Sequence, residues 1–251
     1  MTTGQHGDVE CLWLRRSDHG NALDPDTVSR LHDELSTAEA KSDCLAVVIR
    51  AEGSVFCAGA DVRASAELMR TPELLLSFFD SGRRLMERLV TSRLATIAVV
   101  QGLAAAGGLE LASAADLVIA TEDAVFADRH ATFGFLPAFG ATTLLPMRVG
   151  GRVATSMLLG KRELDASTAL AAGLAHRVCL AAEIDAVIDD EIIRLRQVGV
   201  EAISAIKRLI NEMQPVNFAP EGTAVRKFEE EGGYDPSRFI ARAERGRDSG
   251  R

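Results

Sequence analysis

A basic excess and long apolar runs are both missing from this sequence. Its 251 residues carry 28 Lys and Arg against 36 Asp and Glu, a formal net charge of −8, whereas phosphate binding needs a dense basic face. A nucleic-acid partner is therefore not expected. The apolar run Leu94 to Val100 is far shorter than the roughly 20 residues of a membrane-spanning helix. The polar N-terminus lacks a signal-peptide core, so we expect no membrane segment and no export signal.

Cysteines are few and unpaired in sequence. The four, Cys11, Cys44, Cys57 and Cys179, form no C-x-x-C pair and lie among apolar neighbours. This pattern favours buried free thiols over disulfides or a zinc site. We therefore predict no metal and a reducing, cytoplasmic location.

Short apolar runs alternate with helical segments through the first half of the chain. The runs lie at 46–49, 97–100 and 117–120, and helical spacing covers 67–90 and 109–115. Asp24 before Pro25 is typical of a helix N-cap. Buried strands that alternate with helices predict an α/β fold with mostly parallel strand pairing.

Helical periodicity alone continues after Ala181, with two amphipathic stretches up to Met213. Beyond Pro220 the apolar residues are too few to form a core, so this part should dock on something else, such as another subunit. We accordingly predict a core at 1–195 and a C-terminal helical region at 196–251.

Two glycine-bearing loops follow predicted strands. One is Phe56 to Val62, and the other, Gly102 to Glu110, opens a helix. The first amides of a helix lack internal partners, so the Gly107 N–H could stabilise an oxyanion. Glu110, one turn later on the same face, would suit proton transfer beside an enolate. The same residues would also fit a turn needed for packing and an acid favoured by the helix dipole.

Several motifs in this order resemble the crotonase superfamily, typified by enoyl-CoA hydratase. They are 21–24, 56–62, 102–111 with Asp116, 134–137, 148–151 and 172–174. The similarity extends from about Cys11 to Met213 and covers most of the chain.

The resemblance implies a spiral of ββα units and a C-terminal helical region that forms a homotrimer or a dimer of trimers. It also implies an acyl-CoA substrate, with coenzyme A arriving as part of the substrate and no other cofactor. The thioester oxygen would be held by the Ala58 and Gly107 amides. Ala58, Ala60, Asp61 and Val62 would contact the coenzyme A moiety.

The sequence departs from the hydratase pattern at the second of two catalytic glutamates. The first matches Glu110, but His130 stands at the second position. An imidazole titrates near ~6.5 and could hold a water together with Glu110, or it could simply fill the loop. Superfamily hydrolases that cleave cyclic β-diketones also carry a histidine here, oriented by an aspartate. At the position of that aspartate this sequence has Phe139, which cannot orient an imidazole. Ala106 replaces a common glycine, which is a small change unless its φ is positive.

The leading hypothesis is a lyase that hydrates 2-enoyl-CoA, with Glu110 and His130 as catalytic residues. The alternatives are a double-bond isomerase or a C–C hydrolase of the same superfamily. A further alternative is a non-catalytic acyl-CoA binding protein.

Overall fold

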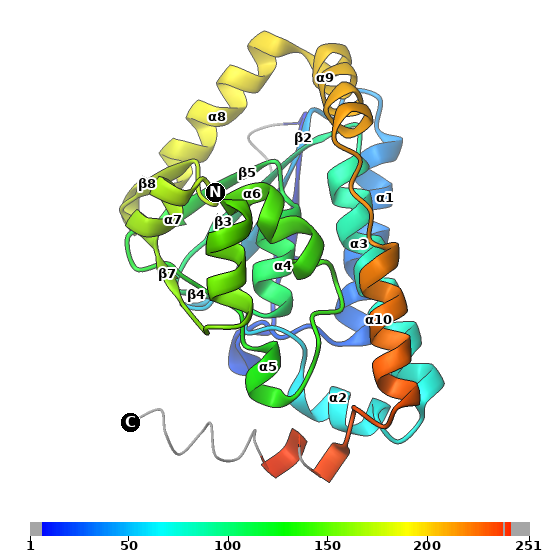
Figure 1. Ribbon diagram of the computed structural model, residues 1–251. Coiled ribbons are helices and arrows are strands. Elements are labelled where there is room, and N and C mark those ends of the chain that lie inside the picture. The colour runs from blue at the N-terminus through cyan, green and yellow to red at the C-terminus, as the bar shows by residue number, and fades with distance from the viewer. Residues whose placement is uncertain (1–6, 238, 242–251) are drawn as a thin grey trace.

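A five-stranded parallel sheet lies at the centre of the molecule (Figure 1). The computed structural model describes residues 7–237 and 239–241. The strand order is β1-β2-β3-β5-β8, with β1 at Val9–Leu14, β2 at Ala46–Ala51, β3 at Ala95–Val100, β5 at Leu117–Thr121 and β8 at Arg177–Cys179. Every neighbouring pair in this sheet is parallel. The predicted α/β class and parallel pairing are therefore confirmed.

Both faces of this sheet are covered, which explains the continuous apolar runs. Alternate residues of a strand point to opposite faces. Val47 and Ile49 belong to one core. It is shared with the helices α1 (Pro25–Ala40), α3 (Pro72–Thr91) and α4 (Gly107–Ala114). Val48 and Ile97 belong to a second core, which is shared with α8 (Ile184–Val198) and α9 (Val200–Met213).

A smaller sheet lies beside the first and leads toward the cavity described below. It contains β4 (Leu103–Ala105), β6 (Val125–Ala127) and β7 (Leu164–Asp165), in the order β4-β6-β7. The chain repeatedly passes from the large sheet to the small one and then into a helix, as in β3-β4-α4 and in β5-β6 followed by α5 (His130–Phe133). The expected succession of ββα units is thus present.

The helices of the first half follow their sequence signals with one difference. α1 spans Pro25–Ala40, and the Asp24 carboxylate accepts the Thr27 N–H at 2.8 Å, as expected of an N-cap. The helix predicted at 67–90 is two helices, α2 (Val62–Leu68) and α3 (Pro72–Thr91). Pro72 lacks an N–H for a continuing helix and instead begins the second one.

The second half of the chain is mainly helical, and the prediction of helices alone after Ala181 is confirmed for the described residues. Its helices are α6 (Ala141–Leu158), α7 (Ala166–Ala172), α8 (Ile184–Val198), α9 (Val200–Met213) and α10 (Ala219–Glu230). The predicted boundary after residue 195 falls inside α8, and the two-part division stays a prediction. None of the described helices is long and apolar enough to cross a membrane.

The segment beyond Pro220 packs on its own chain. α10 contacts α3, and the two helices run side by side in Figure 1. Tyr234 lies 5.1 Å from Phe135 between ring centroids, and Phe239 lies 4.9 Å from the same ring. The docking surface expected for these aromatics is therefore the chain's own core.

The four cysteines are free thiols, as predicted, and all but Cys11 are buried.

Candidate active site

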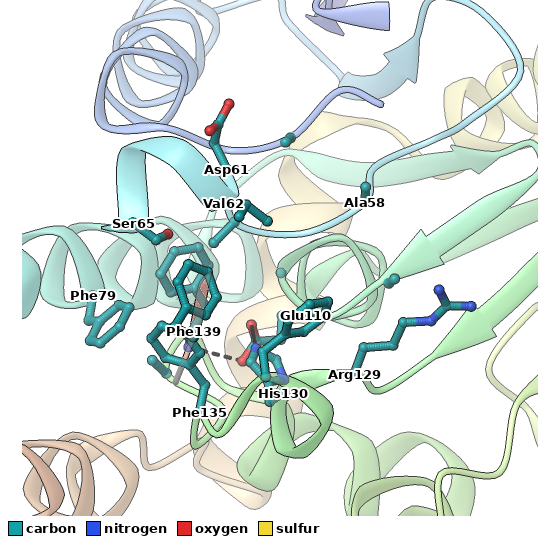
Figure 2. Close-up of a pocket in the computed structure, with 18 of the residues that line it drawn as sticks. Ala58, Asp61, Val62, Ser65, Phe79, Glu110, Arg129, His130, Phe135 and Phe139 are labelled. Carbon is teal, nitrogen blue, oxygen red and sulfur yellow. Dashed lines mark hydrogen bonds and ion pairs between the residues drawn. The ribbon is translucent and has the colours of Figure 1, made fainter. Parts of the chain in front are cut away.

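A cavity of about 510 Å³ opens between the loop at residues 58–62, the start of α4 (Gly107–Ala114), α5 (His130–Phe133) and the segment 135–139. Figure 2 shows Glu110 and His130 together, with Phe79, Phe135 and Phe139 to one side. The aromatic side is apolar, and the opposite side carries the main chain of the two glycine-bearing loops. The structure therefore brings both predicted loops and both predicted catalytic side chains to one cavity.

The junction between β4 and α4 holds an unusual backbone conformation. Ala106 has φ +47° and ψ −116°, and its N–H donates to Ala127 O at 3.0 Å. This region strongly favours glycine, so Ala106 is strained. Because φ is positive, alanine in place of glycine at position 106 is not a small change. The strained turn directs the chain into α4 at Gly107.

Two main-chain amides are available where the loops approach each other. The Gly107 N–H is the first of α4, and the Ala60 nitrogen lies 3.6 Å from the point where a Cβ on Gly107 would be. Within residues 7–237 and 239–241 neither amide has a hydrogen-bond partner. The Ala58 amide, in contrast, donates to Gly20 O at 2.9 Å. The amide of the predicted donor Ala58 is thus already engaged, whereas the amide of Ala60 two residues later is free to donate.

The loop that carries Ala60 is held firmly on both sides. Leu23 N–H donates to Gly59 O and Asp61 N–H donates to Leu23 O, both at 2.8 Å. The Asp61 carboxylate caps α2 by accepting the Arg63 and Ala64 amides, and it binds the Arg16 guanidinium at 2.8 Å. The Asp61 side chain therefore orders the loop.

Glu110 is buried, and one of its two carboxylate oxygens is held by the main chain. Its side chain lies in the first turn of α4, and the residue is only 1% exposed. Oε1 accepts the Phe139 N–H at 2.9 Å and the Ala141 N–H at 3.0 Å. Two charge-assisted hydrogen bonds of this kind stabilise a carboxylate. The other oxygen, Oε2, faces His130.

His130 lies between two carboxylates. Its Nε2 is 3.4 Å from Glu110 Oε2, and its Nδ1 is 2.5 Å from Asp128 Oδ1. Asp128, which is 5% exposed, was not among the predicted site residues. The only signal for it in the sequence is its position two residues before His130, which keeps the two side chains within reach of each other. Arg129 points away and pairs with Glu163 at 2.9 Å (Figure 2).

Electrostatics favours the ionised form of both partners. Burial disfavours the imidazolium, but the carboxylates of Glu110 and Asp128 outweigh it and raise the pKa of His130 to about 10. Burial also disfavours the Glu110 carboxylate, but the charge of His130 and the two main-chain donors lower the pKa of Glu110. The resting pair is therefore an imidazolium next to a carboxylate.

Phe139 contributes to the site through its main chain as well as its ring. Its ring packs against Gly82, where a Cβ would lie 2.3 Å from Cε1 of Phe139, while its N–H holds Glu110. The aromatic ring does not orient the imidazole, but Asp128 does. The inability of Phe139 to orient an imidazole therefore does not leave His130 without an orienting carboxylate.

Within the described residues no group of three or more His, Cys, Asp and Glu side chains is arranged to hold a metal ion. His19 is exposed and also lines the cavity.

Comparisons with known proteins agree with this geometry. The family model described as enoyl-CoA hydratase/isomerase matches residues 5–236. The chain belongs to the enoyl-CoA hydratase/isomerase family. A probable enoyl-CoA hydratase of Mycobacterium tuberculosis is 37% identical over 172 residues, 68% of this chain and 66% of that protein. One of Mycobacterium leprae is 32% identical over 176 residues, 70% of this chain and 67% of that protein.

Solved structures of the family share the fold over almost the whole chain. The crystal structure of an enoyl-CoA hydratase from Mycobacterium avium subsp. paratuberculosis has a TM-score of 0.83 at 27% identity, with 95% of each chain covered. The sequence alignments above span about two thirds of the curated relatives' length. The enoyl-CoA hydratase/isomerase family and the crotonase fold are thereby established for this chain.

Proposed function

We propose that the protein is a hydratase that adds water to a 2-enoyl-CoA thioester through an enolate. The observation that carries this proposal is the pair of unpartnered amides, Ala60 and Gly107, next to a buried carboxylate. Two preorganised donors aimed at one thioester oxygen stabilise the charge that develops on it. Loss of one such donor typically costs about 10²–10³ in rate.

Glu110 and His130 divide the proton transfers. The oxygen of a water adds to Cβ of the substrate while Glu110 Oε2 takes the proton of that water. The His130 imidazolium then gives its Nε2 proton to Cα, and the enolate returns to a thioester. The proton taken up by Glu110 Oε2 passes to His130 Nε2, 3.4 Å away, and restores the starting pair. This assignment follows from the charges, because an imidazolium with a pKa of about 10 is an acid and a lowered carboxylate pKa leaves Glu110 ionised.

The loop at 58–62 is proposed to contact the coenzyme A moiety. Ala58, Ala60, Asp61 and Val62 all line the cavity, and the hydrogen bonds of the loop keep its main chain in place. The Asp61 carboxylate is committed to Arg16 and to the cap of α2, so its contribution to binding is through the main chain. No cofactor is included in this proposal beyond the coenzyme A of the substrate.

A second candidate is C–C cleavage of a β-diketone. The Asp128–His130 hydrogen bond favours it, because an aspartate that orients an imidazole is an arrangement typical of hydrolases with a catalytic histidine. Double-bond isomerisation of a 3-enoyl thioester would use the same enolate. Mass spectrometry of the products from 2-enoyl, 3-enoyl and β-diketone substrates separates these reactions.

The test of hydration is the loss of the conjugated enoyl thioester absorbance on addition of enzyme. Glu110→Gln should lower kcat by about 10²–10⁴, whereas Glu163→Gln, at an exposed site, should leave it unchanged. Absence of turnover at every chain length would contradict the proposal. If acyl-CoA then still protected against thermal unfolding, the protein would be a non-catalytic acyl-CoA binder.

Self-association into a homotrimer or hexamer remains part of the proposal. α9 carries a row of exposed apolar side chains, Ile206, Leu209, Ile210 and Met213, which are 50–82% exposed. Such a face is favourable to cover. A monomer at micromolar concentration in light scattering would contradict this. The cytoplasmic location also remains a prediction.

A further inference from the structure

Glu221 is a buried acid that the proposed mechanism does not use. It lies in the first turn of α10 and is 5% exposed. Its Oε2 accepts the Thr142 N–H at 2.9 Å and also the Thr142 hydroxyl. Its Oε1 is buried and has no hydrogen-bond partner in the part of the chain that the structure describes. One oxygen of this carboxylate is therefore bound to α6, and the other has no partner among the described residues.

Glu221 and Glu110 bind the same turn of the chain. Glu110 takes the amides of residues 139 and 141, and Glu221 takes the next amide, that of Thr142. Gly140 lies within this turn and has φ +130°. A Cβ on Gly140 would lie 2.4 Å from Cε1 of Phe218, the residue that precedes α10. The α10 segment therefore fixes the turn that fixes the Glu110 carboxylate.

Few charges near Glu221 can neutralise it. The charge of Glu110 on α4 disfavours a carboxylate at Glu221, and the charge of His130 on α5 favours one. Tyr234, after α10, stays a neutral phenol because burial and the charge of Glu221 raise its pKa. The Arg83 guanidinium of α3 packs against the neighbouring Gly222, but it pairs with Asp80. Burial and the charge of Glu110 raise the pKa of Glu221 to about 7, against the opposite effect of His130.

We propose that Glu221 is a positioning residue for the Glu110–His130 pair, through its hold on the turn at 139–142 and through the negative charge it places behind Glu110. The proposal rests on the proposed proton transfers, although its electrostatic part holds for any chemistry at this pair. A negative charge near an imidazolium stabilises it. Removal of that charge should therefore make His130 release its proton at lower pH.

Kinetics gives a sharp signature. In Glu221→Gln the alkaline limb of kcat/KM should move to lower pH by about 0.5–1 unit. The acidic limb should stay in place, because Glu221 is already protonated there in the parent protein. KM should stay within about twofold, since Glu221 touches no substrate. Glu230→Gln, on the exposed end of the same helix, should change neither limb.

NMR titration of the His130 imidazole separates this proposal from the proposed function, because it needs no turnover. We expect a lower His130 pKa in Glu221→Gln than in the parent protein or in Glu221→Asp, which keeps the charge. This result supports the proposal even if no enoyl thioester is hydrated. An unchanged His130 pKa in a folded Glu221→Gln protein would overturn it. An equal loss of rate at all pH values in both Glu221 variants would show a structural role only and would also overturn it.

Discussion

Asp128→Asn tests whether the Asp128 carboxylate keeps His130 charged. The structure places Asp128 Oδ1 2.5 Å from His130 Nδ1 in a buried site. A hydrogen bond to a charged group is worth about 1.5–3 kcal/mol, which at about 1.4 kcal/mol per pH unit corresponds to about 1–2 units of pKa. The pKa of His130, about 10 in the parent protein, should therefore fall to about 8–9.

The assay is the pH dependence of kcat/KM for hydration. If the imidazolium is the acid, activity disappears as pH rises through its pKa, so the alkaline limb should move down by the same amount. Glu163→Gln is the matched control, since it removes a carboxylate that pairs with Arg129 next to His130 in sequence. An alkaline limb that stays in place in Asp128→Asn, with the fold intact, would refute the reasoning.

Three further changes test the turn geometry and the buried charges. Ala106→Gly should raise the free energy of unfolding by about 0.5–2 kcal/mol in urea titrations, because relief of a positive φ exceeds the added chain entropy; a loss of stability would contradict the strain. Gly82→Ala should cost about 1–3 kcal/mol and reduce kcat, because its Cβ meets the Phe139 ring, whereas Gly151→Ala, where a Cβ meets nothing within 4 Å, should cost little. Folding raises the pKa of Glu221 from 4.5 to about 7, so the protein becomes less stable as pH rises between these values. Glu221→Gln should therefore raise the free energy of unfolding by up to about 3 kcal/mol above pH 7 and leave it unchanged below pH 4. Equal gains at both pH values would contradict this.

The central sheet was predictable from sequence because its strands are buried on both faces. Continuous apolar runs such as 46–49 have few other uses in a chain of this composition. The N-cap at Asp24 and the start of a helix at Gly107 were also predictable, since both depend on neighbours within one turn. Local chemistry decides these elements, and distant contacts do not alter them.

The donor pair and the acids behind it depend on contacts between distant segments. Whether Ala58 or Ala60 offers a free amide depends on Gly20 O, which takes the Ala58 N–H. The role of Asp128 depends on where the imidazole lies, and that of Glu221 depends on the packing of α10 onto α6. Apart from the nearness of Asp128 to His130 in the sequence, none of these is encoded in spacing along the chain. The residue types were visible in sequence, but their pairing was not.

The most direct test is a crystal structure with a bound 3-hydroxyacyl-CoA or a slow enoyl-CoA analogue. The account predicts the thioester oxygen within about 2.7–3.1 Å of both the Ala60 and Gly107 nitrogens, with Cα and Cβ beside Glu110 and His130. A thioester oxygen bound elsewhere, or a carbonyl that reaches only one of the two amides, would contradict it.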